Sequence, residues 1–142
     1  MGTYAKNDTI RVIIGQKPAG GYEFALDENN GQGPVQKIKF KNDNHPGTMV
    51  YFKIYDPDNT GLVFQPDPAQ ALWVAEGVNN PPAGAKWPGF VPLSVETNGT
   101  RLMVYNRNLK NGITFKFTLR FQDSGGLPVE YDPIGNDMNG SR

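Results

Sequence analysis

Aromatic side chains are the residues in this sequence with the clearest capacity to hold another molecule. Trp73, Trp87 and Phe90 lie in or beside the Gly77–Pro92 segment, which also contains four prolines. In a segment of this length without a regular pattern, the aromatic rings either pack against the core or are exposed to solvent. Its prolines reduce the conformational entropy that is lost when the segment adopts one conformation. Displayed rings stack on sugars or anchor peptide side chains. We therefore expect these three residues to contact a ligand or partner. The competing interpretation is that they only close one end of the core.

Two tyrosines extend this candidate site. Tyr51 and Tyr55 occupy alternate outward positions of a predicted strand, with Lys53 between them. Residues at i, i+2 and i+4 of a strand share one face, so this outer face is amphipathic rather than fully polar. The sequence therefore predicts a contact surface made of the Gly77–Pro92 segment together with both tyrosines.

Metal and thiol chemistry is limited by the residue types present. The chain has no cysteine and a single histidine, His45, within the predicted Asn42–Gly47 loop. Disulfides, thiolate catalysis and cysteine-bound metals are thereby excluded. A blue-copper centre cannot be assembled either, and a zinc site would need carboxylates almost alone. We expect no cofactor and no tightly bound transition metal, and we interpret His45 as an exposed turn residue.

Calcium is the one metal for which the sequence offers an alternative site. Asp56, Asp58 and Asn59 provide oxygen ligands in one turn, and calcium takes its ligands from such loops. Their spacing does not match an EF-hand loop, and Asp and Asn are equally common in turns that bind only their own backbone. Comparable acidic turns occur at Asp27–Asn30 and at Asp132 with Asn136 and Asp137.

Hydrolytic chemistry finds no support in the sequence. Ser94, Ser124 and Ser141 lack the strand–turn–helix context of a nucleophilic serine. A glycosidase needs two acids that face one cleft, and no pattern pairs the scattered glutamates, which are Glu23, Glu76, Glu96 and Glu130. The sequence predicts that the protein is not an enzyme.

Charge and hydropathy narrow the classes of partner. Fourteen basic and fourteen acidic residues give a formal net charge of zero. Nucleic acids and anionic membranes attract proteins through a basic field, so neither is expected as a partner, whereas self-association is compatible with a neutral surface. No apolar run approaches the roughly 20 residues of a membrane helix, and the first residues lack the pattern of a signal peptide. We expect a cytoplasmic protein, with a mature secreted domain as the alternative.

The elements that must position these residues are strands. Apolar and polar residues alternate without a break from Ile113 to Phe121, which is the period of a strand with one buried and one solvated face. Similar runs predict further strands, and Asn98-Gly99 marks a hairpin turn because both residues adopt positive φ readily. The predicted runs are Thr9–Ile14, Tyr22–Leu26, Val35–Lys41, Met49–Tyr55, Leu62–Phe64, Val91–Glu96, Arg101–Tyr105 and Val129–Tyr131.

One stretch permits two interpretations. Asp67-Pro68 can begin a short helical turn through Leu72, because proline is favoured at the first helical position. Alternatively, Ala71–Ala75 forms a strand.

The pattern as a whole predicts an all-β fold with little helix. Eight or nine short strands separated by turns every 8–12 residues are typical of a two-sheet antiparallel β-sandwich, immunoglobulin-like or jelly-roll-like. A closed barrel is the alternative. We expect one domain over residues 1–135, followed by a polar flexible tail over residues 136–142.

The C-terminal third resembles a group of small bacterial β-sandwich proteins. The resemblance lies in the strands Leu102–Asn108 and Phe115–Phe121 and in the closing Asp132-Pro133-Ile134-Gly135-Asn136 element. This group has no assigned activity, so the resemblance implies a sandwich fold and nothing further. From the residues themselves, Asp132 should accept hydrogen bonds from nearby amides and Pro133 should end the last strand.

These observations favour a non-enzymatic β-sandwich module that binds a protein partner through the aromatic, proline-rich segment. One alternative is a structural, self-assembling subunit such as a coat, tail or inclusion-type protein. The other alternative is a carbohydrate-binding domain, with or without calcium.

Overall fold

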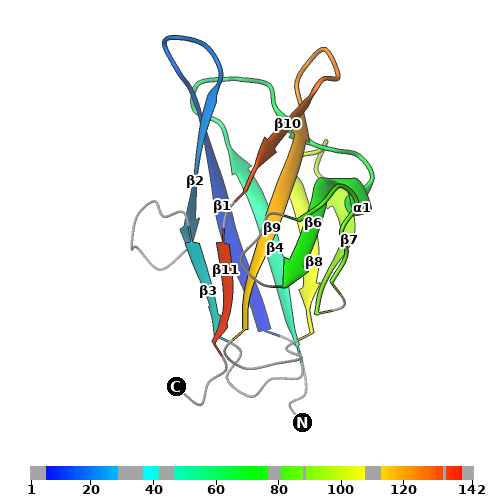
Figure 1. Cartoon of the computed structure of the whole chain (residues 1–142). Coiled ribbons are helices and arrows are strands. Elements are labelled where there is room, and N and C mark those ends of the chain that lie inside the picture. Colours follow the sequence, from blue (N-terminus) through cyan, green and yellow to red (C-terminus); the bar gives the residue numbers. More distant parts are fainter. Residues whose placement is uncertain are drawn as a thin grey trace.

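The fold is built from two β-sheets that pack face to face (Figure 1). The structure, a computed structural model, describes residues 6–28, 37–41, 47–76, 81–87, 89–107, 113–132 and 134–138. Within these residues lie eleven strands and one short helix. The sheets are separate, so the predicted two-sheet sandwich is confirmed and the closed barrel is not formed.

The first sheet has five strands in the order β2-β1-β4-β8-β7. Their bounds are β1 Lys6–Gln16, β2 Tyr22–Glu28, β4 Thr48–Tyr55, β7 Phe90–Glu96 and β8 Arg101–Asn106. The neighbours are antiparallel except β1 and β4, which run parallel with Ile10 opposite Phe52. The expectation of purely antiparallel pairing therefore needs correction here.

The second sheet is organised around β9, which pairs with different strands along its two edges. Strands β10 and β11 lie along one edge, and β5 and β6 lie along the other. β3 extends the sheet beyond β11 through a second parallel pairing. The bounds are β3 Lys37–Lys41, β5 Val63–Phe64, β6 Leu72–Glu76, β9 Ile113–Gln122, β10 Pro128–Tyr131 and β11 Ile134–Met138.

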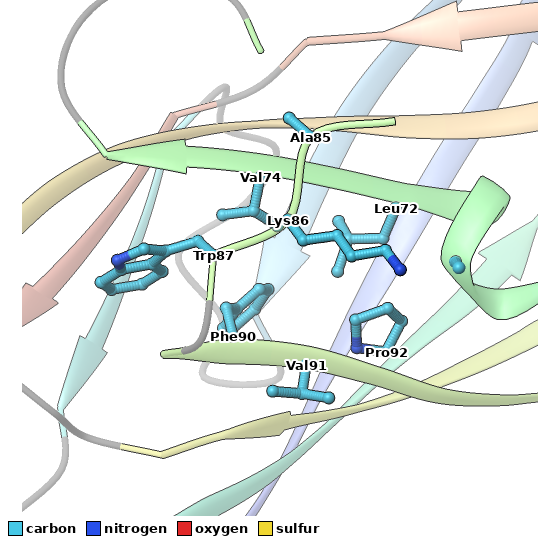
Figure 2. Close-up of a pocket in the computed structure, with 9 residues that line it drawn as sticks. Leu72, Val74, Ala85, Lys86, Trp87, Phe90, Val91 and Pro92 are labelled. Carbon is cyan, nitrogen blue, oxygen red and sulfur yellow. The ribbon is translucent and has the colours of Figure 1, made fainter. Parts of the chain in front are cut away.

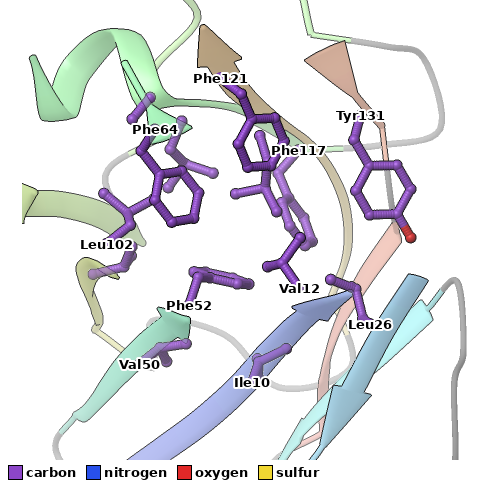
Figure 3. Packing of buried hydrophobic residues seen from close by; sticks show 14 of the residues in the cluster. Ile10, Val12, Leu26, Val50, Phe52, Phe64, Leu102, Phe117, Phe121 and Tyr131 are labelled. Carbon is purple, nitrogen blue, oxygen red and sulfur yellow. The ribbon is translucent and has the colours of Figure 1, made fainter. Parts of the chain in front are cut away.

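The core lies between the sheets and follows the alternation of apolar residues. In β4, Val50 and Phe52 are buried, whereas Lys53 is exposed. In β9, Phe117, Leu119 and Phe121 are buried as predicted. Figure 3 shows Phe117 and Phe121 of β9 facing Ile10, Val12 and Leu26 of the first sheet across the gap between the sheets. Aromatic pairs strengthen this packing: the Phe64 and Phe121 rings stack with centroids 5.0 Å apart.

The second face of β9 is less solvated than the alternation predicted. Thr118 was expected on the wet face but is only 2 % exposed. Its hydroxyl donates a 2.5 Å hydrogen bond to Asp132, which accounts for a buried polar group in this position. Asp132 therefore accepts from a side-chain hydroxyl, and no backbone amide of the described residues donates to it, in contrast to the prediction from the sequence.

Both interpretations of residues 67–75 are correct, one after the other. Asp67 accepts a hydrogen bond from the Ala69 amide and caps helix α1, Pro68–Ala71, which has proline at its start. The chain then turns extended at Leu72 and continues as β6. None of the described helical segments is long and apolar enough to cross a membrane.

Two predicted boundaries are wrong. The irregular Gly77–Pro92 segment ends earlier than expected, because β7 already begins at Phe90. The predicted tail likewise begins too early, since residues 136–138 belong to β11: Asn136 and Asp137 pair with both β3 and β9, and Met138 pairs with β3. In β7 the alternation of apolar residues is interrupted by Pro92, and in β11 by Gly135, so neither strand boundary could be recognised from the sequence. The Ile38 and Phe40 side chains and residues 42–46, with His45, lie outside what the structure describes.

Candidate functional site

A pocket of about 330 Å³ opens at the edge of the sandwich between β6 of one sheet and β7 of the other. Figure 2 shows the residues that line it. They come from α1, from β6, from the segment that crosses between the sheets, and from the start of β7. The lining residues are Ala69, Leu72, Val74, Ala85, Lys86, Trp87, Phe90, Val91 and Pro92. Eight of these nine carry apolar side chains.

The inner wall of the pocket is part of the hydrophobic core. Leu72 and Val74 alternate along β6 and point inward, where each is about 1 % exposed. Phe90 stands opposite them from β7 and is equally buried. Its ring lies 6.0 Å from that of Phe117 and 6.5 Å from that of Phe52. A wall fixed by the core keeps its shape whether or not the pocket is filled.

The outer wall is the crossing segment, residues 81–87, which is hydrogen-bonded to β6. The Val74 amide donates to the Ala85 carbonyl at 3.2 Å, and the Ala85 amide donates to the Pro82 carbonyl at 3.0 Å. Pro81 is buried. The bond to Val74 attaches this segment to the edge of β6 and places the following residues, Lys86 and Trp87, beside the pocket.

A tight turn fixes the position of Trp87. The Phe90 amide donates to the Trp87 carbonyl at 3.1 Å, and the Arg107 amide donates to the Gly89 carbonyl at 2.8 Å. A Cβ placed on Gly89 would lie 2.7 Å from the Trp87 ring. Only glycine therefore permits the ring to rest on this turn. The indole is half-buried and packs against the core from one side.

Lys86 is the one charged residue of the lining. Its side chain is exposed and, in Figure 2, extends toward Pro92 and α1, away from Trp87. It takes part in none of the ion pairs that join described residues. Because no carboxylate of the described residues pairs with this ammonium group, it is available to an anionic group from another molecule.

The lining residues are almost all apolar, and Lys86 is the charged group among them. None of the nine carries a carboxyl, hydroxyl, imidazole or thiol group. Across the described part of the chain, no three residues of the types His, Cys, Asp and Glu come together as a metal site. The pocket can thus hold an apolar group and orient it against Lys86.

The structure brings together two of the five predicted contact residues. Trp87 and Phe90 both line the pocket, with Phe90 as its buried floor rather than a displayed ring. Trp73 lies on the opposite face of β6, where the Arg120 guanidinium stacks 4.1 Å above its ring. It is 8 % exposed, and its indole nitrogen has no hydrogen-bond partner within the described structure.

Tyr51 and Tyr55 lie on the outer face of the first sheet, away from the pocket residues. Each ring is in contact with a guanidinium group: Arg101 lies 4.3 Å from the Tyr51 centroid and Arg11 lies 4.9 Å from that of Tyr55. Such contacts stabilise the rings in place and occupy one face of each. The two tyrosines form a second surface and not an extension of the first.

The residues proposed for calcium already have partners in the fold. Both Asp56 carboxylate oxygens accept hydrogen bonds, from the Thr60 amide and hydroxyl and from the Gly61 amide, at 2.9–3.0 Å. Asp58 accepts from the Gln16 amide at 3.0 Å, and Asn59 adopts a positive φ of 54°. These contacts are those of a structural turn, in which amide protons point at the oxygens that a cation would need.

Several residues that line the pocket were not predicted from the sequence. Leu72, Val74 and Ala69 carry no functional signature, and Lys86 looks like any exposed lysine. The available signal was the run of prolines and glycines before Trp87, which predicted an irregular segment but not that the chain crosses from one sheet to the other there.

Neither a protein-family model, nor a curated protein, nor a solved structure matches this chain. The functional interpretation therefore rests on the geometry of the pocket.

Proposed function

We propose that this chain is a non-enzymatic binding module that holds an apolar group of a ligand or partner in the pocket between β6 and β7. The observation that carries the proposal is the pocket itself, which has about 330 Å³ of space and an almost wholly apolar lining. Binding sites for small molecules are typically preformed clefts of roughly 300–1,000 Å³ with few polar groups.

Pre-organisation supports this proposal. The inner wall belongs to the core, the outer wall is hydrogen-bonded to β6, and the Trp87 ring rests on the Gly89 turn. A ligand that enters does not have to order these groups, so less binding energy is lost to conformational entropy. The aromatic ring at one end provides a large contact area for a bound apolar group.

A blocking variant tests the proposal. Ala69 lines the pocket, and Ala69→Trp would fill it, whereas Ala83→Trp adds the same ring at an exposed position of the crossing segment outside the lining. Octanol is the probe, and amide chemical shifts in two-dimensional NMR are the readout. We expect octanol to shift the amides of Leu72, Val74 and Phe90 in the wild type and in Ala83→Trp but not in Ala69→Trp. Shifts confined to other regions, or unchanged in the blocked variant, would contradict the proposal.

Self-assembly is the second candidate function, and the outer face of the first sheet favours it. Tyr51 lies opposite Met103 in the pairing of β4 with β8, and Met49 lies opposite Tyr105. With the two stacked arginines, this face is rich in Tyr, Met and Arg, which are enriched at protein interfaces. Sedimentation of the wild type and of Tyr51→Ala tests this function, because an assembly that uses this face should dissociate in the variant.

A further inference from the structure

The charge distribution around the pocket indicates the class of ligand that it accepts. We propose that the pocket binds a small carboxylate of about eight carbon atoms in all, with an apolar chain or ring, its carboxylate paired with the Lys86 ammonium. This inference rests on the proposed function and adds the chemistry of the ligand to it.

The size of the pocket limits the apolar part of the ligand. With about 330 Å³, the pocket lies at the lower end of the roughly 300–1,000 Å³ that small-molecule sites span, so a small ligand is favoured over a large one. A ligand with roughly ten non-hydrogen atoms fits this space, which corresponds to octanoate, a chain of about eight carbons that includes the carboxylate carbon. A single leucine or valine side chain of a partner protein would leave most of the pocket empty. An empty apolar space forfeits contacts with its lining, so a longer chain is favoured.

The lining determines where the polar end of the ligand lies. Leu72, Val74 and Phe90 form a wall without an exposed polar side chain, so a charge placed there would be desolvated without compensation. Lys86 lies at the open side of the pocket and its ammonium has no described ion-pair partner. A carboxylate at this rim keeps contact with water while its apolar chain is buried.

Trp87 and Pro92 define the two ends of the binding site. Figure 2 places the indole at one end and the proline ring at the other, with the Lys86 amine on the Pro92 side. The ligand is therefore expected to direct its carboxylate toward Pro92 and its apolar end toward Trp87. This orientation predicts that octanoate quenches or shifts the fluorescence of Trp87.

The test compares octanoate with octanol in three proteins: the wild type, Lys86→Gln and Lys53→Gln. Lys53 is an exposed lysine on the outer face of the first sheet, so its substitution changes the net charge equally at a distance from the pocket. Dissociation constants are measured by calorimetry. We expect Lys86→Gln to weaken octanoate binding about five- to tenfold and to leave octanol binding within about twofold, while Lys53→Gln changes neither.

Four outcomes would overturn the inference. If Lys86→Gln and Lys53→Gln weaken octanoate binding equally, the effect is one of net charge. If octanol binds the wild type as tightly as octanoate, the pocket is apolar but not selective for an anion, and the proposed function stands without this refinement. If a short peptide with a C-terminal leucine binds with the same dependence on Lys86 and octanoate does not, the occupant is a peptide terminus. Failure of both octanol and octanoate to bind would contradict the proposed function as well.

Discussion

Trp87 and Phe90 are three residues apart in the sequence but have different energetic roles. Phe90 is about 1 % exposed and contacts two other core rings, so Phe90→Ala should lower the free energy of unfolding by about 3–5 kcal/mol. Trp87 is half-buried at the pocket, and Trp87→Ala should lower it by less, about 1–2 kcal/mol, while octanol binding is lost. Urea denaturation and the NMR titration measure the two effects. A larger loss of stability for Trp87→Ala, with binding retained, would assign the ring to the core alone.

Thr97 adopts a backbone conformation that is unfavourable for its residue type. Thr97, Asn98 and Gly99 have φ values of 56°, 55° and 86° in the turn between β7 and β8. The left-handed region costs an ordinary L-residue about 1–2 kcal/mol, and asparagine tolerates it better. We expect Thr97→Asn to raise the free energy of unfolding by about 0.5–1 kcal/mol in urea denaturation. Thr97→Val keeps the branched Cβ and should leave the free energy of unfolding nearly unchanged. Equal effects of the two variants would show that backbone strain at position 97 does not limit stability.

Tyr131 provides a dependence of stability on high pH. Burial against Phe24, whose ring lies 5.0 Å away, raises the pKa of the Tyr131 hydroxyl above its ordinary value. In the unfolded chain this tyrosine loses its proton near pH 10, whereas the folded protein retains it. Rising pH therefore stabilises the unfolded state, and the contribution of Tyr131 to stability is complete below pH 10 and declines above it.

The expected slope for this single group approaches about 1.4 kcal/mol per pH unit above pH 10. Urea denaturation of the wild type between pH 8 and pH 11.5 should show this decline, and Tyr131→Phe should show a shallower one. An identical slope in the two proteins would mean that Tyr131 does not cause it.

At the scale of the elements, the alternation of residues in β4 makes a direct test of register possible. Phe52 is fully buried, and the next residue, Lys53, is exposed on the opposite face. Phe52→Ala should lower the free energy of unfolding by about 3–5 kcal/mol, whereas Lys53→Ala should change it by no more than about 0.5 kcal/mol. Because a shift of one residue exchanges the two faces, similar losses in the two variants would show that the register is wrong.

The element that frames the pocket, β7, could be predicted only in part. Its alternation indicated a strand from Val91, but Pro92 argued against a regular central strand. Both observations fit the structure, because β7 is a strand at the edge of its sheet, where proline is tolerated, and its register with β8 shifts between Pro92 and Ser94. The absent amide of proline faces no partner strand there, and an irregular edge discourages pairing with other chains.

At the scale of the whole molecule, the solution mass separates the two candidate functions. A binding module that uses the pocket should sediment as a single chain, with and without octanoate. A large, defined oligomer that persists in Ala69→Trp and dissociates in Tyr51→Ala would instead favour assembly through the outer face of the first sheet. The measurement is sedimentation velocity at several protein concentrations.

The sequence by itself determined the fold class and most of the core, because a buried face requires apolar residues at every second position of a strand. Phe117 and Phe121 were identified in this way. Only the tertiary structure decided which aromatic residues share a site. Trp73 and Trp87 lie close to the same irregular segment, yet β6 directs Trp73 to its outer face beside Arg120, while Trp87 follows a segment that crosses to the other sheet. The alternation along a strand shows which residues lie on opposite faces of it. Which of those faces line a pocket depends on the order of the strands in the two sheets. The pocket, and with it the role of Lys86, depends on that order.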